Sequence, residues 1–251
     1  MKVYFIGAGP GDPELVTLKA VKVLQQAEVI IYAGSLVNPE VLCHARQMAE
    51  IYDSAPLPLE EIMAIMEKAI GEGKTVARVH TGDPSLYGAI QEQMDWLDRR
   101  GIPYEVVPGV SSFLAAAASL KREYTIPGVS QTVIISRLEG RTGVPEKEAL
   151  ALLARHRASL CIFLSVHLIG EVVEELKKGY PGDTPVAVVE KASWPEERVL
   201  RGRLEDIERL VKEEGIRKTA LILVGDFLLA QSQPSKLYHP GFQHGFRGKA
   251  E

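Results

Sequence analysis

The sequence has few cysteines, the residues that stabilise small folds through disulfide bonds or bound metal ions. Its 251 residues include only two cysteines, Cys43 and Cys161, and neither belongs to a Cys-x-x-Cys pair or a Cys/His cluster. This count excludes a disulfide scaffold and a zinc module. So few cysteines are typical of a protein whose thiols stay reduced, and we therefore expect a cytoplasmic location.

Long apolar runs and an excess of one charge are also missing. No stretch reaches the roughly 18 apolar residues of a membrane span, and the first apolar run is too short for a signal peptide core, so we expect no membrane partner. The chain carries 29 basic and 33 acidic residues, a net charge of −4, and we expect no nucleic-acid partner. Its 46% hydrophobic residues suit a globular protein of one large domain or two.

Several familiar catalytic signatures are absent from the sequence. The segment Gly71-Glu72-Gly73-Lys74-Thr75 lacks the spacing of a phosphate-binding P-loop. There is no Gly-x-Ser-x-Gly and no His-Glu-x-x-His, and the six histidines are scattered. We therefore expect neither an activated nucleophile of these kinds nor a resident metal.

What the sequence does contain is an alternation of short Val/Ile-rich runs with segments of helical period, the pattern of an α/β protein with largely parallel strands. The predicted strands are 3–6, 29–32, 75–79, 104–107, 132–136, 160–164, 185–189, 199–202 and 220–224. The predicted helices are 15–26, 59–71, 89–100, 111–120, 146–156, 168–178 and 204–214. A charged segment with a Pro-Gly turn at 121–130 breaks the pattern. We predict domains at 1–120 and 121–230, followed by a poorly ordered tail at 231–251.

A glycine-rich loop, Gly7-Ala8-Gly9-Pro10-Gly11, follows the first predicted strand. Glycines there let a ligand approach the backbone at the carboxyl edge of a parallel sheet. The dinucleotide fingerprint does not fit, because Asp12 stands where its third glycine would be and because Pro10 and Pro13 interrupt the helix start. A tight turn without a ligand is the alternative interpretation.

Two further polar loops follow predicted strands, His80-Thr81-Gly82-Asp83-Pro84-Ser85-Leu86-Tyr87-Gly88 and Pro108-Gly109-Val110-Ser111-Ser112. In the first of them, Asp83 could simply initiate a turn or cap the next helix, and Ser111 or Ser112 could cap the helix after the second. Three such loops in one half of the chain nevertheless favour a common ligand site.

Together the three loops resemble those of the tetrapyrrole methylase family. The segments Tyr32-Ala33-Gly34-Ser35-Leu36-Val37, Ile126-Pro127-Gly128-Val129-Ser130-Gln131-Thr132 and Arg137-Leu138-Glu139-Gly140-Arg141-Thr142 are similar to the branch that methylates carbon 11 of precorrin-4 or cobalt-precorrin-4 in cobalamin biosynthesis. The resemblance covers residues 3–228. It implies two α/β domains with mostly parallel sheets, S-adenosylmethionine bound in the interdomain cleft, and a homodimer.

The resemblance also implies a set of site residues. Cofactor contacts would come from Pro10, Thr81, Gly82, Asp83, Ser111, Ser112, Leu164, Ala192, Thr219 and Ala220. Relatives often have methionine and glycine where this chain has Leu164 and Ala192.

Methyl transfer from a sulfonium needs alignment and dehydration more than a strong acid or base, so a site of backbone groups and small side chains is chemically suitable. We expect Asp83 to favour the cationic cofactor, and His80 or Glu139 to accept a proton after methylation. The substrate of the resemblance carries many carboxylates, for which Arg137, Arg141 and Lys191 are the expected partners, although each could be a solvated surface charge.

Three alternatives stay open on the sequence. The chain could methylate another macrocycle position, such as carbons 2 and 7 of uroporphyrinogen-III. It could bind a nucleotide or tetrapyrrole without turnover. It could also methylate ribosomal RNA or a protein side chain, although the acidic charge balance counts against the RNA substrate.

Overall fold

The structure, a computed structural model, describes residues 1–231, 239 and 241–243. Most of the predicted tail therefore lies outside the described residues. The chain forms two compact units: Met1–Ser119 with Lys191–Arg198, and Leu120–Glu190 with Val199–Glu251. The segment Lys191–Arg198, which the sequence analysis placed within the second domain, thus belongs by its contacts to the first unit.

The first unit contains a five-stranded parallel sheet in the order β3-β2-β4-β1-β5. Its strands are β1 (Val3–Gly7), β2 (Val29–Tyr32), β3 (Glu50–Asp53), β4 (Val76–His80) and β5 (Tyr104–Val107), and its helices are α1 (Leu18–Gln26), α2 (Leu59–Gly71), α3 (Gln91–Arg99) and α4 (Ser112–Leu120, of which Leu120 is assigned to the second unit). Short 3₁₀ turns lie at η1 (Pro13–Leu15) and η2 (Pro39–His44).

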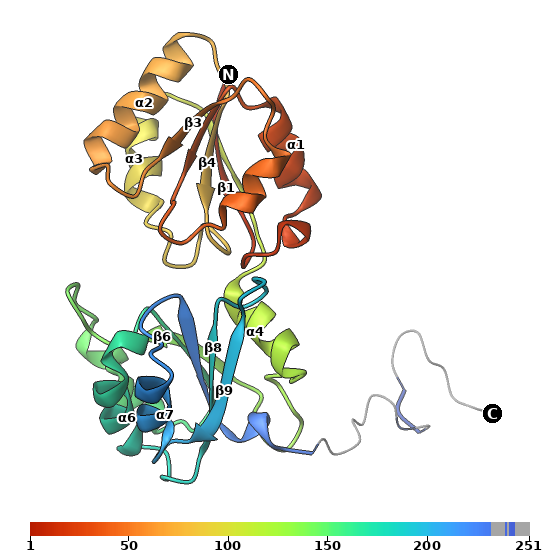
Figure 1. The fold of residues 1–251 in the computed structure, drawn as a ribbon, viewed down its shortest axis with the longest axis vertical. Helices are drawn as coiled ribbons and strands as arrows, with labels where there is room; N and C mark the ends of the chain where they lie inside the picture. The colour runs from red at the N-terminus through yellow and green to blue at the C-terminus, as the bar shows by residue number, and fades with distance from the viewer. Residues whose placement is uncertain (232–238, 240, 244–251) are drawn as a thin grey trace. The chain divides into compact units, whose positions relative to one another are not determined.

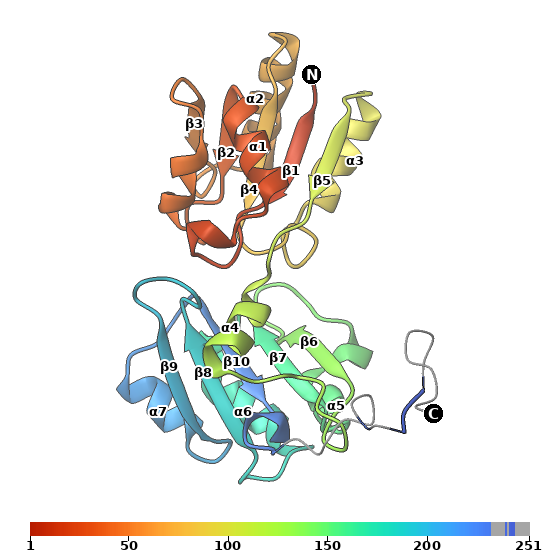
Figure 2. The same cartoon turned by 90° about the vertical axis from the view of Figure 1, so that its right-hand side faces the viewer.

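Helices cover both faces of this sheet (Figures 1 and 2). On one face, Ala20, Val23 and Leu24 of α1 pack with Ile30 and other strand residues. On the other face, α2 and α3 contribute a second apolar cluster with the alternate residues of the same strands. Because both faces are covered, the inner strands β1 and β2 are almost entirely apolar, and so is β4 apart from Arg78 and His80, which is why the sequence predicts them well.

The second unit contains a mixed sheet in the order β6-β7-β10-β8-β9. Its strands are β6 (Val133–Arg137), β7 (Ser159–Phe163), β8 (Pro185–Glu190), β9 (Arg198–Arg203, of which Arg198 is assigned to the first unit) and β10 (Ala220–Val224), and its helices are α5 (Leu150–Ala154), α6 (Ile169–Lys177) and α7 (Ile207–Glu213). The 3₁₀ turns are η3 (Glu146–Glu148), η4 (Val166–Leu168) and η5 (Asp226–Leu228).

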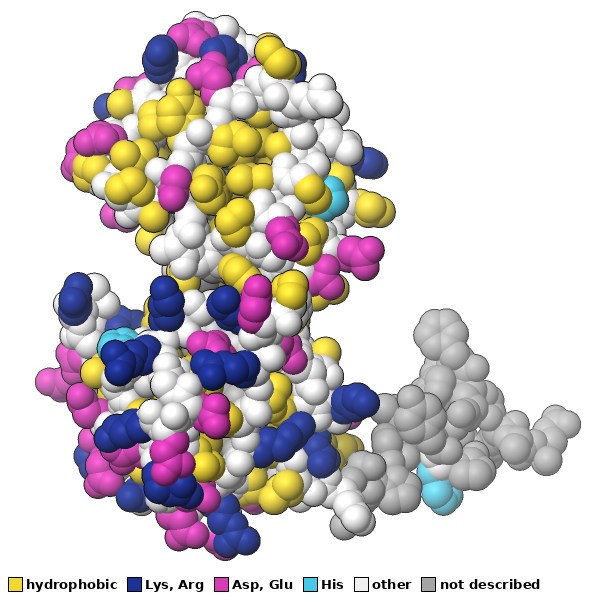
Figure 3. Space-filling model, viewed as in Figure 1, with side chains coloured by type: hydrophobic (Ala, Val, Ile, Leu, Met, Phe, Trp, Pro, Cys, Tyr) yellow, Lys and Arg dark blue, Asp and Glu magenta, His cyan; other side chains and the backbone are white. Residues whose placement is uncertain are grey.

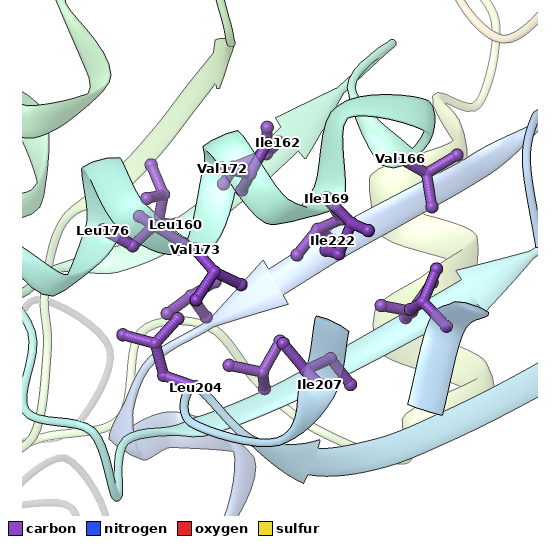
Figure 4. Close-up of a cluster of buried hydrophobic side chains, with 14 of the residues drawn as sticks. Leu160, Ile162, Val166, Ile169, Val172, Val173, Leu176, Leu204, Ile207 and Ile222 are labelled. Carbon is purple, nitrogen blue, oxygen red and sulfur yellow. The ribbon is translucent and has the colours of Figure 1, made fainter. Parts of the chain in front are cut away.

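Helices α5, α6 and α7 bury one face of this sheet. Val172, Val173 and Leu176 of α6 meet strand residues such as Ile162 and Ile222, all of them fully or almost fully buried (Figure 4). The core is made of branched aliphatic side chains, which pack densely in well-defined rotamers.

The expectation of mostly parallel sheets is confirmed for the first unit, and the α/β class holds for the chain as a whole. In the second sheet, however, β10 runs antiparallel to both of its neighbours, β7 and β8, while β6 and β7 are parallel. Its sequence Ala-Leu-Ile-Leu-Val does not reveal this direction, because a central strand covered on both faces is apolar whichever way it runs.

Several predicted elements are shorter than expected. The segment expected as one helix over 146–156 is η3 followed by α5, and the one expected over 204–214 is α7 alone. The helix expected to begin at 89 begins at Gln91, because Tyr87 and Ala89 adopt left-handed backbone angles (φ 58° and 48°). The sequence analysis missed β3 altogether.

In the part of the chain that the structure describes, no helix is both long enough and apolar enough to cross a membrane.

Candidate functional site

The three loops singled out in the first half of the sequence lie side by side in the first unit. They follow β1, β4 and β5, which are consecutive in the sheet, with β1 in the middle. Gly9 and Gly82 form a β-bridge, in which the Gly82 amide donates to the Gly9 carbonyl at 2.7 Å. The parallel strands thus bring all three loops to one edge of the sheet, where α/β proteins bind small ligands.

Close backbone packing holds the loops against one another. A Cβ atom built on Gly7 would lie 2.6 Å from the Gly109 Cα, and one built on Gly109 would overlap the Gly82 carbonyl oxygen. A side chain at Gly7 or Gly109 would therefore force the loops apart. Glycine is required here by the close approach of three backbones.

Asp83 links two of the loops with its carboxylate. One oxygen accepts from the Gly109 amide at 2.9 Å, and the other accepts from the Ser85 amide at 2.8 Å. Thr81 is partly exposed, Gly82 and Ser111 are buried, and Ser112 begins α4. The structure therefore assigns Asp83 a definite task in shaping the loops, in addition to any effect of its charge on a ligand.

His80 ends β4 and is 5% exposed, with its ring against that of Phe5. Its Nε2 atom is buried and has no hydrogen-bond partner. Burial, together with the nearby charge of Arg78, lowers the pKa of His80 to about 3. Such a group is a poor proton acceptor near neutral pH, so of the two expected proton acceptors, His80 and Glu139, the exposed Glu139 is better suited to the role, and both stay predictions.

Arg78 is a buried cation that ties several strand ends together. Its Nη1 atom donates to the Ser54 hydroxyl at 2.9 Å and to the Ile31 carbonyl at 3.4 Å, and its Nε atom donates to Gln93 at 3.3 Å. Gln93 in turn donates to the Ala89 carbonyl at the end of the second loop. These hydrogen bonds connect Arg78 of β4, through Gln93, to the residue that follows the second loop. The sequence analysis missed them because Arg78 stands within a predicted strand of mostly apolar residues.

Four of the site residues expected from the second half of the chain, Arg137, Leu164, Thr219 and Ala220, lie at one end of the strands of the second sheet. Arg137 pairs with Phe163 at the ends of two parallel strands, just before Leu164. Ala220 begins β10, which runs antiparallel to β7, so it lies at the same end of the sheet as Leu164, and it pairs with Glu190 of β8. Thr219 and Leu164 both have positive φ (53° and 55°), and the Leu164 side chain is 53% exposed.

The basic residues expected to bind substrate differ in their surroundings. The Arg137 guanidinium donates to the carbonyls of Thr142 and Gly143 at 3.1 and 2.7 Å, so it folds its own loop back on itself. Arg141 and Glu139 lie exposed on that loop. On the face drawn in Figure 3, lysine and arginine side chains lie among aspartate and glutamate side chains on the second unit, while hydrophobic side chains predominate on the first. Arg141 is thus better placed than Arg137 to meet an external carboxylate.

Lys191 and Ala192 belong to the segment that joins the first unit late in the chain. Ala192 is buried between two residues of positive φ, Lys191 and Ser193 (49° and 69°). The Lys191 ammonium group lies over the Trp194 ring and pairs with Glu196 at 3.5 Å. Ala192 therefore lies in the same unit as Pro10, Thr81, Gly82 and Ser111, although it is distant from them in sequence.

The chemistry of the three loops fits a neutral or cationic ligand. They contain no lysine or arginine, and they offer backbone amides, carbonyls and the short hydroxyls of Thr81, Ser111 and Ser112. A polyphosphate would lack its usual basic partners here. An adenosyl group, whose hydroxyls and ring nitrogens bond to backbone groups, suits this set, and so does a single sulfonium charge.

Within the described residues, no group of three or more potential metal ligands is found among histidine, cysteine, aspartate and glutamate side chains.

This fold and these loops are typical of α/β proteins that bind a small organic ligand at the carboxyl edge of a parallel sheet. The family model of the tetrapyrrole (corrin/porphyrin) methylases matches residues 2–208, and the chain belongs to that family.

Individual relatives are similar over almost the whole chain. The cobalt-precorrin-4 C(11)-methyltransferase of Methanocaldococcus jannaschii is 56% identical over 98% of this chain and 96% of its own length. The X-ray structure of a cobalamin biosynthetic enzyme, cobalt precorrin-4 methyltransferase, superimposes with a TM-score of 0.88 at 49% identity, over 91% of this chain and 96% of that one. A uroporphyrin-III C-methyltransferase from Thermus thermophilus, complexed with S-adenosylhomocysteine, gives a TM-score of 0.76 at 32% identity, over 91% and 99%.

Proposed function

We propose that the protein transfers a methyl group from S-adenosylmethionine to carbon 11 of precorrin-4 or of its cobalt-bound form, as a step of cobalamin biosynthesis. The observation that carries this proposal is the 56% identity, over 98% of the chain, to an archaeal cobalt-precorrin-4 C(11)-methyltransferase. The uroporphyrin-III methylase is less similar, at 32% identity, which argues against that regiochemistry. We expect the protein to act as a cytoplasmic homodimer.

The cofactor is proposed to bind at the loops of the first unit. Pro10, Thr81, Gly82, Ser111, Ser112 and Ala192 of this unit would hold it there, and the family resemblance adds Leu164, Thr219 and Ala220 as further cofactor contacts. The solved uroporphyrin-III methylase that holds S-adenosylhomocysteine supports this cofactor class. S-adenosylmethionine supplies an electrophilic methyl group on a sulfonium.

The protein's own contribution is alignment rather than acid–base chemistry. Asp83 fixes the second loop against the third by accepting from the Gly109 amide, and the buried Arg78 network supports the other end of that loop. Rigid loops hold a bound ligand in one orientation, which lowers the entropic cost of an in-line displacement. Arg141, and Glu139 as a proton acceptor, are the candidates for direct contact with the substrate.

The test is a methyl-transfer assay on the purified protein with precorrin-4, cobalt-precorrin-4 and uroporphyrinogen-III in parallel. We expect a mass increase of one methyl group on a precorrin-4 substrate, and NMR of the product made with ¹³C-labelled cofactor should place the label on carbon 11. Methylation of uroporphyrinogen-III alone would contradict the proposed regiochemistry. Binding of S-adenosylhomocysteine without turnover of any of the three would favour a non-catalytic binding protein.

A further inference from the structure

Residues 191–198, hereafter the strap, pass from the end of β8 to the start of β9 and belong to the first unit. Two successive turns shape the strap: the Trp194 amide donates to the Lys191 carbonyl at 2.9 Å, and the Glu197 amide donates to the Trp194 carbonyl at 3.0 Å. Lys191 and Ser193 hold left-handed backbone angles (φ 49° and 69°), which are strained in a residue other than glycine. A conformation of this kind persists only where surrounding contacts hold it.

Those contacts are made with the glycine loop after β1. The indole Nε1 of Trp194 donates to the Pro10 carbonyl at 2.9 Å. The Ser193 hydroxyl accepts from the Asp12 amide at 3.0 Å. The strap thus bonds to backbone groups on both sides of Gly11, and the Asn38 side-chain amide donates to the carbonyl of Gly11 itself.

The Trp194 ring also fills space that a side chain at position 11 would need. A Cβ atom built on Gly11 would overlap the indole ring, and Gly11 has a φ of 157°, which favours glycine. Loop and strap are therefore complementary in shape as well as in hydrogen bonding. Contact with Trp194 therefore explains why the third glycine of the loop, Gly11, has no side chain, although the two residues lie more than 180 positions apart in the sequence.

The strap is itself anchored on its other side. One oxygen of the Glu197 carboxylate accepts from the Ser193 amide at 2.6 Å and from the Ser119 hydroxyl of α4 at 2.8 Å. The indole is consequently held by a turn whose two ends are fixed, rather than by a freely moving surface segment.

We propose that Trp194 is a positioning residue for the cofactor loop: by holding the Pro10 carbonyl and covering Gly11, it fixes the loop in the conformation that accepts the adenosyl cofactor. The inference rests on the proposed function, since it takes S-adenosylmethionine as the ligand of this loop. It assigns Trp194 no contact with the reacting atoms. Tryptophan suits the role because it combines a large flat ring with a single N–H donor at the far edge.

The first test replaces Trp194 by phenylalanine, which keeps an aromatic ring and removes the N–H. Calorimetric titration of the full-length protein with S-adenosylhomocysteine should give a dissociation constant about 3- to 10-fold higher than that of the unaltered protein, the range expected for one lost hydrogen bond. The Michaelis constant for S-adenosylmethionine should rise similarly, with a smaller change in kcat. Ser193→Ala, which removes the acceptor of the Asp12 amide, should weaken binding in the same direction and serves if Trp194→Phe does not fold.

Trp96→Phe is the matched control, because the chain has only two tryptophans and Trp96 lies on α3 beneath the Arg100 guanidinium. This variant should bind S-adenosylhomocysteine as the unaltered protein does. It also leaves Trp194 as the only tryptophan, so saturating S-adenosylhomocysteine should change its fluorescence. In Trp194→Phe the emission of Trp96 should stay unchanged.

The outcomes separate the two proposals. If the unaltered protein binds S-adenosylhomocysteine and Trp194→Phe binds it equally well, the positioning role is wrong and the proposed function stands. A constant Trp194 emission on saturation would equally overturn the positioning role. If the unaltered protein does not bind S-adenosylhomocysteine at all, the proposed function fails, and the role of Trp194 fails with it.

Discussion

At the scale of single residues, polar side chains buried beneath the loops decide how the site is built. Arg78 and His80 lie two positions apart on β4 and point to the same face of the sheet, each about 5% exposed. Arg78 has neutral hydrogen-bond partners in Ser54, Ile31 and Gln93. Burial lowers its pKa to about 10, which still leaves it charged at neutral pH.

The depressed pKa of His80 predicts a loss of stability in mild acid. Its pKa is about 3 in the folded protein and about 6.5 in the unfolded chain, so the unfolded state binds the extra proton between these values. The stabilisation is complete above pH 6.5 and is lost as the pH falls toward 3. We expect the free energy of unfolding to decrease by about 2 kcal/mol between pH 7 and pH 5 on account of this residue.

Urea unfolding at both pH values measures this effect. His80→Gln should lose about 2 kcal/mol less than the unaltered protein over the same interval, whatever its stability at pH 7. His156→Gln, at an exposed position, should show the full loss. An equal decrease in all three proteins would show that His80 does not titrate abnormally.

The roles of individual residues could be predicted only in part from the sequence. The glycine loops and Asp83 could be identified, because glycine after a buried strand has a limited set of purposes. Sequence analysis assigned Arg137 to the substrate, whereas its guanidinium bonds to carbonyls five and six residues ahead. Nothing in a sequence says whether a surface arginine turns outward or back onto its own loop.

At the scale of elements, buried strands were predictable and edge strands were not. β3 is a four-residue edge strand, Glu-Ile-Tyr-Asp, whose charged ends resemble a loop. It becomes a strand by pairing with β2, and that pairing is a property of the fold rather than of the segment. Strand order and strand direction, which bring the three loops together and set β10 antiparallel, are equally invisible in local patterns.

Because β10 lies at the centre of the second sheet, truncating one of its buried side chains should lower the free energy of unfolding strongly. Ile222 is fully buried and pairs with Ile162 on one side and Val188 on the other. Ile222→Ala should lower the free energy of unfolding by about 2–5 kcal/mol in urea, with the slope against denaturant unchanged. Leu229→Ala, at a side chain that is 68% exposed, is the control and should change it by less than about 0.5 kcal/mol. A cost below 1 kcal/mol at Ile222 would contradict the central place of this strand.

At the scale of the whole molecule, the chain passes between the two units three times, after residues 119, 190 and 198. The strap in the first unit is therefore attached at both ends to strands of the second sheet. Unfolding of the second unit would release the strap and remove the partners of Pro10 and Asp12. We infer that the two units unfold together.

The two tryptophans make this measurable, because Trp96 and Trp194 both belong to the first unit. Ile222→Ala alters only the second unit, yet it should shift the urea midpoint of tryptophan fluorescence as far as that of far-ultraviolet circular dichroism. Independent units would give a fluorescence midpoint that the substitution leaves in place, together with a biphasic dichroism curve.

The strap also has a consequence for synthesis. The glycine loop leaves the ribosome well before the indole that bonds to it, which follows 184 residues later. Until the strap has been synthesised, the loop therefore lacks the contacts that shape it. A nascent chain halted before residue 194 should carry a largely formed first sheet with an unfinished ligand loop, so competence to bind arises only after the strap has been synthesised.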